Sequence, residues 1–306
     1  MKRFLLKVFF ATIFALLVAV SVIALRIALA QKAVDVAFDV PPGTEVIFIG
    51  NSHTGCSWTE APEFRDRKVW NHSMGFPIHY VRFLELERRG AFDRGVKTCV
   101  VDCDKTSLAG FKTQVIYENM LTSLPFAWRH LTALPLPLRE VVVEIFSHAS
   151  WDFSIAGEPP EDDHVWTELP EARQKAFFAH NYGASWQTPA AWDSVAYPVD
   201  WQTRFYEMVA DMKARCDRHG VRLILFASPL ASQDPGRSIP GIAQRISDVA
   251  ARVREMGVEY YDYRTACPDD QFRDAGHLLR RSAYEFTKKF YEEVLKLPVG
   301  ELRSIE

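Results

Sequence analysis

The sequence lacks an excess of basic residues. Lys and Arg together number 36 against 39 Asp and Glu in 306 residues, which gives a formal net charge of −3. A surface that binds a polyanion needs a field of basic charge, so we expect no nucleic-acid partner. Internal repeats and low-complexity tracts are also missing, and the content of hydrophobic residues, 48%, is that of an ordinary globular protein.

Cysteines are few, five in all, and odd in number. Their spacings fit no metal site. Cys99 and Cys103 fall on the same face of one expected strand at a separation of about 13 Å, which is too far for a direct bridge. A disulfide between distant cysteines stays open, and we expect most of the five to be small buried hydrophobic residues: Cys56, Cys99, Cys103, Cys216 and Cys267.

Nothing in the sequence points to a metal or a cofactor. Three histidines, His53, His72 and His79, follow the first expected strand. None of their spacings puts two histidines one helical turn apart with a carboxylate beside them, which is the pattern of a zinc site on a helix. We read His72 and His79 as surface or packing residues and expect neither a metal nor a cofactor.

One long hydrophobic run is present, at the N-terminus. Residues 8–25 are almost all apolar, and Lys2, Arg3 and Lys7 precede them. Their length is about that needed to cross a bilayer core of roughly 30 Å. Because a basic flank stays in the cytoplasm, the pattern predicts a signal anchor or transmembrane helix over 1–30, with the rest of the chain extracytoplasmic. A signal peptide cleaved after its Ala-Leu-Ala end is the alternative.

Beyond a short tether over 31–44, apolar runs alternate with helical patterns. Strands that alternate with helices predict a parallel sheet covered by helices on both faces. We therefore expect an α/β domain over 45–306, and such sheets place their sites at the carboxyl ends of the strands. The expected strands are 46–49, 97–103, 221–227 and 258–263, and the expected helices are 78–89, 201–219, 242–256 and 282–297.

A long segment over about 106–200 breaks this alternation. It is rich in Pro, Trp and His and contains an acidic turn over 158–163. We read it as a helical insertion that caps the carboxyl edge of the sheet as a lid or substrate surface, and an irregular decoration without function is the alternative. Its aromatic residues suit stacking on sugar rings and equally suit core packing: Trp128, Trp151, Trp166, Trp186 and Trp192.

A polar cluster, Gly50-Asn51-Ser52-His53, begins where the first expected strand ends. At such a turn a serine hydroxyl lies near backbone N–H groups, which can present a nucleophile and stabilise an oxyanion. Ser and Asn also favour turns and helix caps for structural reasons, so the serine alone leaves both interpretations open. A serine nucleophile further requires a histidine base with an orienting carboxylate.

Asp274 and His277 supply such a pair in the segment 272–279, between the last expected strand and the last expected helix. Asp274 can fix the tautomer of the imidazole while the other ring nitrogen faces Ser52. In the alternative, Asp274 caps a turn and His277 packs against the final helix. The catalytic interpretation predicts a triad of Ser52 as nucleophile, His277 as base and Asp274 as orienting residue.

With these residues the chain resembles the SGNH (GDSL-like) hydrolase and acyltransferase superfamily. Gly50-Asn51-Ser52-His53 stands where the family often has Gly-Asp-Ser, and Asp-Ala-Gly-His over 274–277 matches its last block. The resemblance implies a flavodoxin-like three-layer α/β sandwich with a central parallel sheet. The anchored layout is similar to the membrane-tethered branch, which includes proteins that O-acetylate alginate or D-alanylate teichoic acids.

The resemblance also implies an oxyanion hole. The second family block offers Gly75, with help from Asn71 and from the backbone N–H of Ser52, while Asn51 and His53 flank the serine and line the pocket. The third block usually supplies an asparagine after the strand, and the segment 99–107 contains none. An ionised aspartate of this segment cannot donate a hydrogen bond. The tethered branch often lacks that asparagine.

The function implied is an extracytoplasmic serine esterase or O-acyltransferase, on a single-pass anchor in the cell membrane and facing the periplasm or cell surface. The acyl group of an ester would pass to water or to a hydroxyl of a cell-surface or exported glycan. The partners implied are an acyl ester or acylated glycan substrate, the membrane, and a multi-spanning membrane O-acyltransferase. A catalytically degenerate SGNH-like domain that binds such an acyltransferase or a glycan is the alternative, which the missing asparagine supports.

Overall fold

The computed structural model describes residues 2–51, 54, 68–73, 79–103, 199–274 and 276–297. These residues fall into two compact units. One contains the N-terminal helix α1 (Lys2–Ala37), and the other contains every described residue from Val40 onward. The predicted site residues Ser52, His53 and Gly75 and most of the expected insertion over 106–200 lie outside the described residues.

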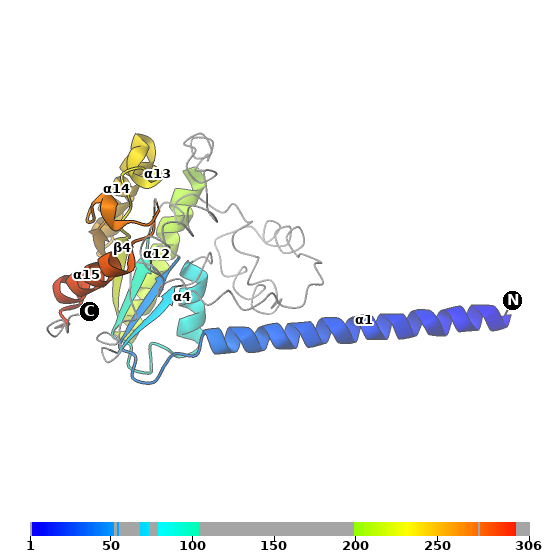
Figure 1. Cartoon of the computed structure of the whole chain (residues 1–306). Helices are drawn as coiled ribbons and strands as arrows, with labels where there is room; N and C mark the ends of the chain where they lie inside the picture. The colour runs from blue at the N-terminus through cyan, green and yellow to red at the C-terminus, as the bar shows by residue number, and fades with distance from the viewer. Residues whose placement is uncertain are drawn as a thin grey trace. The chain divides into compact units, whose positions relative to one another are not determined.

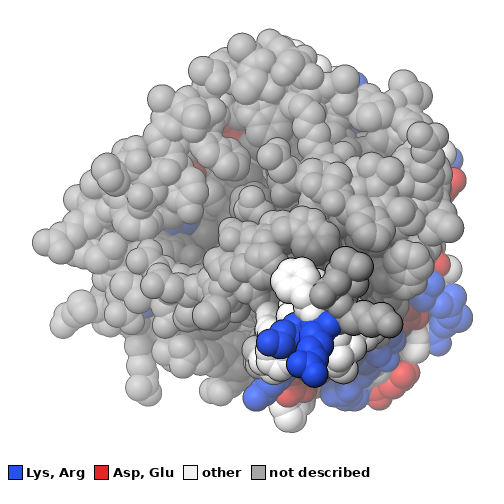
Figure 2. All heavy atoms as spheres, turned by 90° about the vertical axis from the view of Figure 1, so that its right-hand side faces the viewer, with Lys and Arg blue, Asp and Glu red and all other residues white. Residues whose placement is uncertain are grey.

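The helix α1 is continuous over Lys2–Ala37 (Figure 1). It includes residues 31–37, which the sequence assigned to the expected tether. Val8, Phe9 and Phe10 are all exposed, and because successive helical residues are about 100° apart, apolar side chains lie on every side. Figure 2 shows one face of the chain, on which Lys and Arg atoms lie beside white side chains among the described residues. Among the described residues, no helix combines the length and apolar character that a membrane crossing requires.

The second unit is built on a parallel sheet with the strand order β2-β1-β3-β4-β5. This is the flavodoxin-like order, in which the chain starts near one edge and then adds strands in the other direction. The predicted α/β fold with a central parallel sheet is therefore confirmed. The strands are β1 (Val46–Gly50), β2 (Val69–Ser73), β3 (Thr98–Asp102), β4 (Arg222–Ala227) and β5 (Glu259–Asp262).

Helices cover both faces of this sheet. On one face α4 (His79–Arg88) packs on β1, α12 (Val199–His219) on β4 and α14 (Pro240–Glu255) on β5. On the other face lies α15 (Arg280–Phe290), which continues into a π-helical turn, η3 (Tyr291–Leu295) (Figure 1). Two covered faces explain why the central strands β1 and β3 are buried along their whole length.

The core between α15 and the sheet centres on Phe290, which is fully buried. Its ring lies 5.8 Å from that of Phe48 and 5.9 Å from that of Phe226, measured between centroids. Phe48 and Phe226 come from β1 and β4, and Tyr263, just after β5, is 5.7 Å away. One aromatic side chain thus joins the last helix to three strand segments, and this fixes the position of the connection that precedes α15.

Most predicted elements agree with the observed ones within a few residues. Helices α12 and α14 stop near Gly220 and Gly257, whose φ angles of +65° and +74° are in the left-handed region that glycine tolerates. The strand β2 was not predicted, because Val69–Ser73 is a short, half-buried edge strand of mixed polarity. Two short helices were also not predicted, α13 (Pro235–Ser238) and η2 (Asp269–Gln271).

Candidate active site

The carboxyl ends of all five strands lie at one edge of the sheet, because the strands are parallel. Asn51 and Thr54 follow β1 at this edge, Asp102 is the last residue of β3, and Ser228 follows β4. The connection from β5 to α15 also leaves from this edge. The sequence-predicted residues Asp274 and His277 belong to that connection, so they lie in the part of the fold where parallel sheets bind substrates.

Asp274 and His277 occupy the tip of a tight hairpin. Phe272 and Leu278 form an antiparallel bridge, and the Arg273 N–H donates to the carbonyl of His277 over 3.0 Å. Phe272 and Leu278 are buried in the core, 4% and 1% exposed, so both arms of the hairpin are anchored by apolar side chains. The hairpin therefore has an anchored base, although the described residues of its tip form no regular secondary structure.

The Asp274 carboxylate organises this tip. Its Oδ1 accepts hydrogen bonds from the backbone N–H groups of Gly276 and His277, each over 2.9 Å. The Nδ1 atom of His277 lies 2.8 Å from Oδ1 and 2.9 Å from Oδ2 of the same carboxylate. Since an ionised carboxylate only accepts hydrogen bonds, Nδ1 carries the ring hydrogen of the neutral imidazole. The lone pair of His277 then belongs to Nε2, which is the arrangement of a general base.

Asp274 is ionised at neutral pH. Burial by itself raises the pKa of this carboxyl, but the His277 ring, the Gly276 N–H and Arg273 together lower it to about 2. The Arg273 side chain is 1% exposed, and its Nε lies 3.9 Å from Asp274 Oδ2. A buried anion is stable when it is surrounded by such donors and cations, so Asp274 can both orient the imidazole and stabilise its protonated form.

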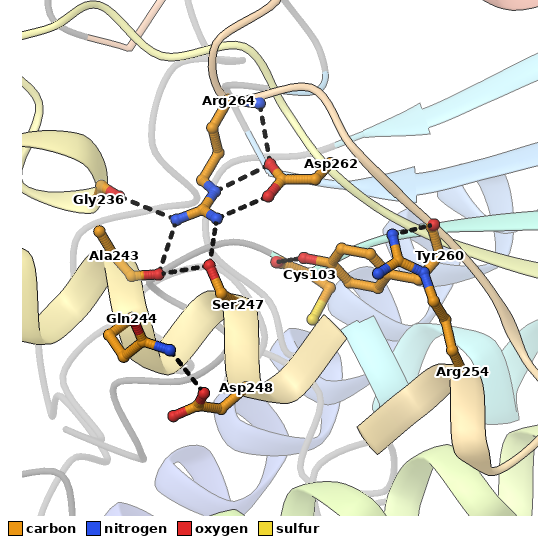
Figure 3. Close-up of polar contacts among 10 residues, drawn as sticks. All are labelled: Cys103, Gly236, Ala243, Gln244, Ser247, Asp248, Arg254, Tyr260, Asp262 and Arg264. Carbon is orange, nitrogen blue, oxygen red and sulfur yellow. Dashed lines mark hydrogen bonds and ion pairs between the residues drawn. The ribbon is translucent and has the colours of Figure 1, made fainter. Parts of the chain in front are cut away.

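Arg264 connects the exit of β5 to neighbouring segments (Figure 3). Its guanidinium forms a bidentate pair with Asp262, the last residue of β5, with N–O distances of 2.9 and 2.6 Å. It also donates to the carbonyl oxygens of Gly236 and Ala243 and to the Ser247 hydroxyl. These bonds fasten the start of the β5–α15 connection to α14 and to the segment that precedes it, and this connection contains the hairpin.

The structure also describes two further residues that the sequence predicted for the site, Asn51 and Asn71. Asn51 follows β1 directly and is 8% exposed. Asn71 lies within β2, opposite Phe48 of β1, and its Oδ1 accepts from the Ser73 N–H and hydroxyl over 3.2 and 2.6 Å. His72, read as a packing residue, is 3% exposed, and burial lowers its pKa to about 3. It is a neutral residue whose ring contacts Trp70.

Sequence reasoning missed a buried polar cluster at the same edge. Arg82 of α4 and Asp102 of β3 are 0% and 2% exposed, and Thr54 is fully buried between the chain ends of β1 and β3. One signal could have revealed it. Arg82 lies on the apolar stripe of α4 with His79, Phe83 and Leu86, where a cation has no place unless a partner is buried with it.

A shallow hollow lies at the opposite edge of the sheet. It has a volume of about 350 Å³ and is lined by residues 41–44 and 68–70, which precede or begin β1 and β2. The hollow is therefore at the amino ends of the strands. It contains none of the predicted site residues.

No known family model matches this chain, and neither does any curated protein. Among solved structures, it is similar to a putative acylhydrolase from Bacteroides fragilis, with 12% identity, coverage of 87% of this chain and 95% of that chain, and a TM-score of 0.45. It is also similar to a GDSL-like lipase from Bacteroides thetaiotaomicron, with 11% identity, coverage of 87% and 97%, and a TM-score of 0.43. Likeness at this level identifies no function.

Proposed function

We propose that this chain is an SGNH-type serine esterase or O-acyltransferase in which Ser52, His277 and Asp274 act as one unit. The observation that carries the proposal is the contact between His277 and Asp274, in which both carboxylate oxygens face the Nδ1–H of the imidazole. Both residues belong to the connection that leaves the carboxyl edge of the sheet after β5. Such a pair keeps the second ring nitrogen basic and oriented. The nucleophile is assigned from the sequence, in which Ser52 is the second residue after β1.

In the proposed reaction, the Ser52 oxygen attacks the acyl carbonyl carbon while His277 Nε2 takes the hydroxyl proton. The tetrahedral intermediate then collapses. The bond to the leaving oxygen or sulfur breaks, and His277 returns the proton to that atom, which leaves an ester on Ser52. Asp274 remains ionised throughout and stabilises the imidazolium.

The second half of the reaction frees the serine. His277 takes a proton from water or from a sugar hydroxyl, whose oxygen attacks the carbonyl of the acyl-Ser52 ester. Collapse of this intermediate breaks the bond to the Ser52 oxygen, which recovers its proton from His277. The product is a carboxylic acid when water attacks and a new ester when a glycan hydroxyl attacks.

The oxyanion of both intermediates would be stabilised by the backbone N–H groups of Ser52 and Gly75 and by Asn71. The contacts of Asn71 support its part. Because its Oδ1 accepts from Ser73, the amide is oriented with its nitrogen away from that residue, and the two N–H groups of the amide can donate elsewhere. Asn51 and His53 would flank the nucleophile.

We also propose, from the sequence pattern of an apolar run over 8–25 behind a basic flank, that the segment 1–30 anchors the chain in the cell membrane, with the catalytic domain extracytoplasmic. Apolar side chains on every side of a helix suit a lipid environment, whereas a helix that packs on a protein surface needs only one apolar stripe. Those of α1 are exposed around the whole helix, Phe9, Phe14 and Leu17 among them, and Arg3 and Lys7 precede the run. An anchored enzyme could take its acyl group from a multi-spanning membrane O-acyltransferase and pass it to an exported glycan.

Labelling of the full chain with a fluorophosphonate in detergent tests the enzymatic proposal, since the probe reacts only with an activated serine. We expect labelling of the wild type and none of Ser52→Ala or His277→Ala. A folded wild-type protein that resists the probe would indicate the alternative, a binding partner without catalysis. Hydrolysis of p-nitrophenyl acetate with and without an added oligosaccharide then separates the esterase from the transferase, because only a transferase acetylates the sugar.

A further inference from the structure

A buried carboxylate joins three strand ends at the carboxyl edge. Asp102, the last residue of β3, is 2% exposed. Its Oδ2 accepts a hydrogen bond of 2.6 Å from the Thr54 hydroxyl and a weaker one of 3.4 Å from the hydroxyl of Ser228, which follows β4. A short bond from a hydroxyl to a buried carboxylate is strong and directional, so Asp102 fixes the side chain of Thr54.

Thr54 in turn lies against the end of β1. A Cβ atom added to Gly50 would be 2.1 Å from the Thr54 hydroxyl oxygen and 2.2 Å from its Cβ, so the threonine side chain occupies the space that any larger residue at position 50 would need. The residues at the two ends of the segment 50–54 are therefore in direct contact. Ser52 is the middle residue of this segment in the sequence.

The other end of the segment is held by Arg82. This fully buried side chain of α4 donates from Nη2 to the carbonyl of Gly50 and from Nη1 to the carbonyl of His72, each over 2.6 Å. Burial lowers the pKa of Arg82 to about 9, with Asp102 opposing that shift, so the group remains a cation at neutral pH. Arg82 thus joins the ends of β1 and β2 and brings a positive charge near Asp102.

The attraction between the buried charges of Arg82 and Asp102 contributes little net stability, because the cost of removing both charges from water offsets it. The clearest effect of the two groups is geometric. The guanidinium fork and the carboxylate have fixed directions, and they bind the two ends of the segment 50–54, Arg82 at the Gly50 carbonyl and Asp102 at the Thr54 hydroxyl. This is the arrangement expected of groups that support a site and do not themselves react.

We propose that Asp102, acting through Thr54, is a positioning residue for the nucleophile Ser52, and that Arg82 fixes the other end of the same segment. The proposal rests on the proposed function. It assigns a role to an aspartate in the segment where the family resemblance implies an asparagine. Asp102 accepts a hydrogen bond from the protein at that edge, so its contribution is to place the serine and not to donate to the oxyanion.

The test compares two variants of Thr54 with opposite defects. Thr54→Val keeps the shape and loses the hydroxyl, whereas Thr54→Ser keeps the hydroxyl and loses a methyl group. We expect Thr54→Val to lower kcat for p-nitrophenyl acetate about 10- to 100-fold with KM within twofold of wild type, because small displacements of a nucleophile cost this much. Thr54→Ser should recover most of the rate even if its Tm is the lower of the two. If the role of Thr54 were purely structural, the activities of the two variants would instead follow their Tm values.

Thr287→Val is the matched control. Thr287 is also fully buried, and its hydroxyl donates to the Ala283 carbonyl over 2.7 Å within α15. This variant should keep the wild-type kcat. Asp102→Asn, which removes the charge and retains an acceptor, provides a second route and should also lower kcat about 10-fold, with the loss again in kcat and not in KM.

The outcomes separate this proposal from the proposed function. A wild-type chain without Ser52-dependent labelling by fluorophosphonate overturns the proposed function and this proposal with it. Normal labelling of the wild type together with wild-type kcat in folded Thr54→Val, or in folded Asp102→Asn if the first variant does not fold, overturns this proposal alone. Equal losses in Thr54→Val and Thr54→Ser would also overturn it.

Discussion

The Nδ1 atom of His277 lies within 2.9 Å of both carboxylate oxygens of Asp274, three residues earlier in the chain. Oδ1 of the same carboxylate also accepts from two backbone N–H groups of the hairpin tip. The orientation of the imidazole is therefore determined within four residues of sequence. In the proposed triad, a base that its own loop orients then needs only to be placed near Ser52.

The first prediction concerns the proposed triad. Ser52→Ala and His277→Ala should lower kcat/KM for p-nitrophenyl acetate by at least about 10³-fold and by similar factors, because neither group activates anything without the other. Asp274→Asn should cost less, since a histidine near the serine keeps some basicity. All three variants should remain folded, as circular dichroism would verify, because Asp274 and His277 belong to the β5–α15 connection at the sheet edge and Ser52 follows β1 in the sequence.

The matched control for the histidine is His219→Ala. His219 at the end of α12 also has its Nδ1 2.9 Å from a carboxylate, that of Asp93, but outside the candidate site. This variant should retain the wild-type rate. Near wild-type turnover in a folded His277→Ala protein would contradict the triad, and Ser52 would then be a turn residue.

The second prediction links Asp274 to stability. Its pKa in the folded chain, about 2, is below the ordinary value of 3.8, so the carboxylate stabilises the fold above pH 3.8 and this contribution is lost as the pH falls through 2. The shift corresponds to about 2 kcal/mol at neutral pH. Urea unfolding of wild type and Asp274→Asn should therefore differ by up to about this amount at pH 7 and by roughly half of it at pH 3. Asp270→Asn, at an exposed aspartate of η2, should show less than about 0.5 kcal/mol at either pH.

The same pKa shapes the pH dependence of activity. Because Asp274 stays ionised down to about pH 2, the acid limb of kcat/KM should report a single proton, the one taken up by His277. A limb that falls with the slope of two protons would contradict this assignment. The measurement needs only initial rates at saturating and limiting ester between pH 4 and 8, approximate limits chosen to lie above the Asp274 pKa.

The third prediction concerns Gly50, the last residue of β1. A methyl group here would meet the Thr54 side chain at 2.1 to 2.5 Å, so Gly50→Ala should lower the free energy of unfolding by about 1 to 3 kcal/mol, the usual cost of overpacking. Gly241 in α14 is the control. Nothing lies within 4 Å of an added Cβ there, and Gly241→Ala should be neutral or slightly stabilising, since alanine is the better helix former. Equal Tm values for the two variants would show that Thr54 moves aside at no cost.

The fourth prediction concerns the orientation of the chain. A phosphatase that is active only after export, fused behind Glu306, should be active, and a fluorescent protein that matures only in the cytoplasm should be dark at the same position. The reason is the positive flank of residues 2–7 before the apolar run. The opposite pattern of the two reporters would contradict an extracytoplasmic catalytic domain.

Retention of the anchor is a separate measurement. If the N-terminal anchor is retained, carbonate at high pH should not extract the protein from membranes. Sequencing should then still detect its N-terminal residues. A soluble periplasmic protein that begins after about residue 30 would indicate the cleaved signal peptide instead.

Local patterns in the sequence determined much of this fold. The apolar runs form β1, β3, β4 and β5, and the segments with helical spacing form α4, α12, α14 and α15. A strand buried on both faces requires a continuous apolar run, and a helix buried along one stripe requires apolar residues at helical spacing, so both patterns can be recognised in the sequence. The helix ends near Gly220 and Gly257 could also be predicted from the sequence. The Asp274–His277 pair could be inferred for the same reason, since three residues separate the partners and one hairpin tip brings them together.

The contacts that support the candidate site could be found only in the tertiary structure. The bond from Thr54 to Asp102 joins residues 48 positions apart, and that from Arg82 to Gly50 spans 32. The edge strand β2 likewise exists through its pairing with β1, because its own half-buried sequence has no strong strand pattern. Such contacts depend on which strands become neighbours, and the order β2-β1-β3 is set by how the connecting segments pack on the sheet and not by any local propensity.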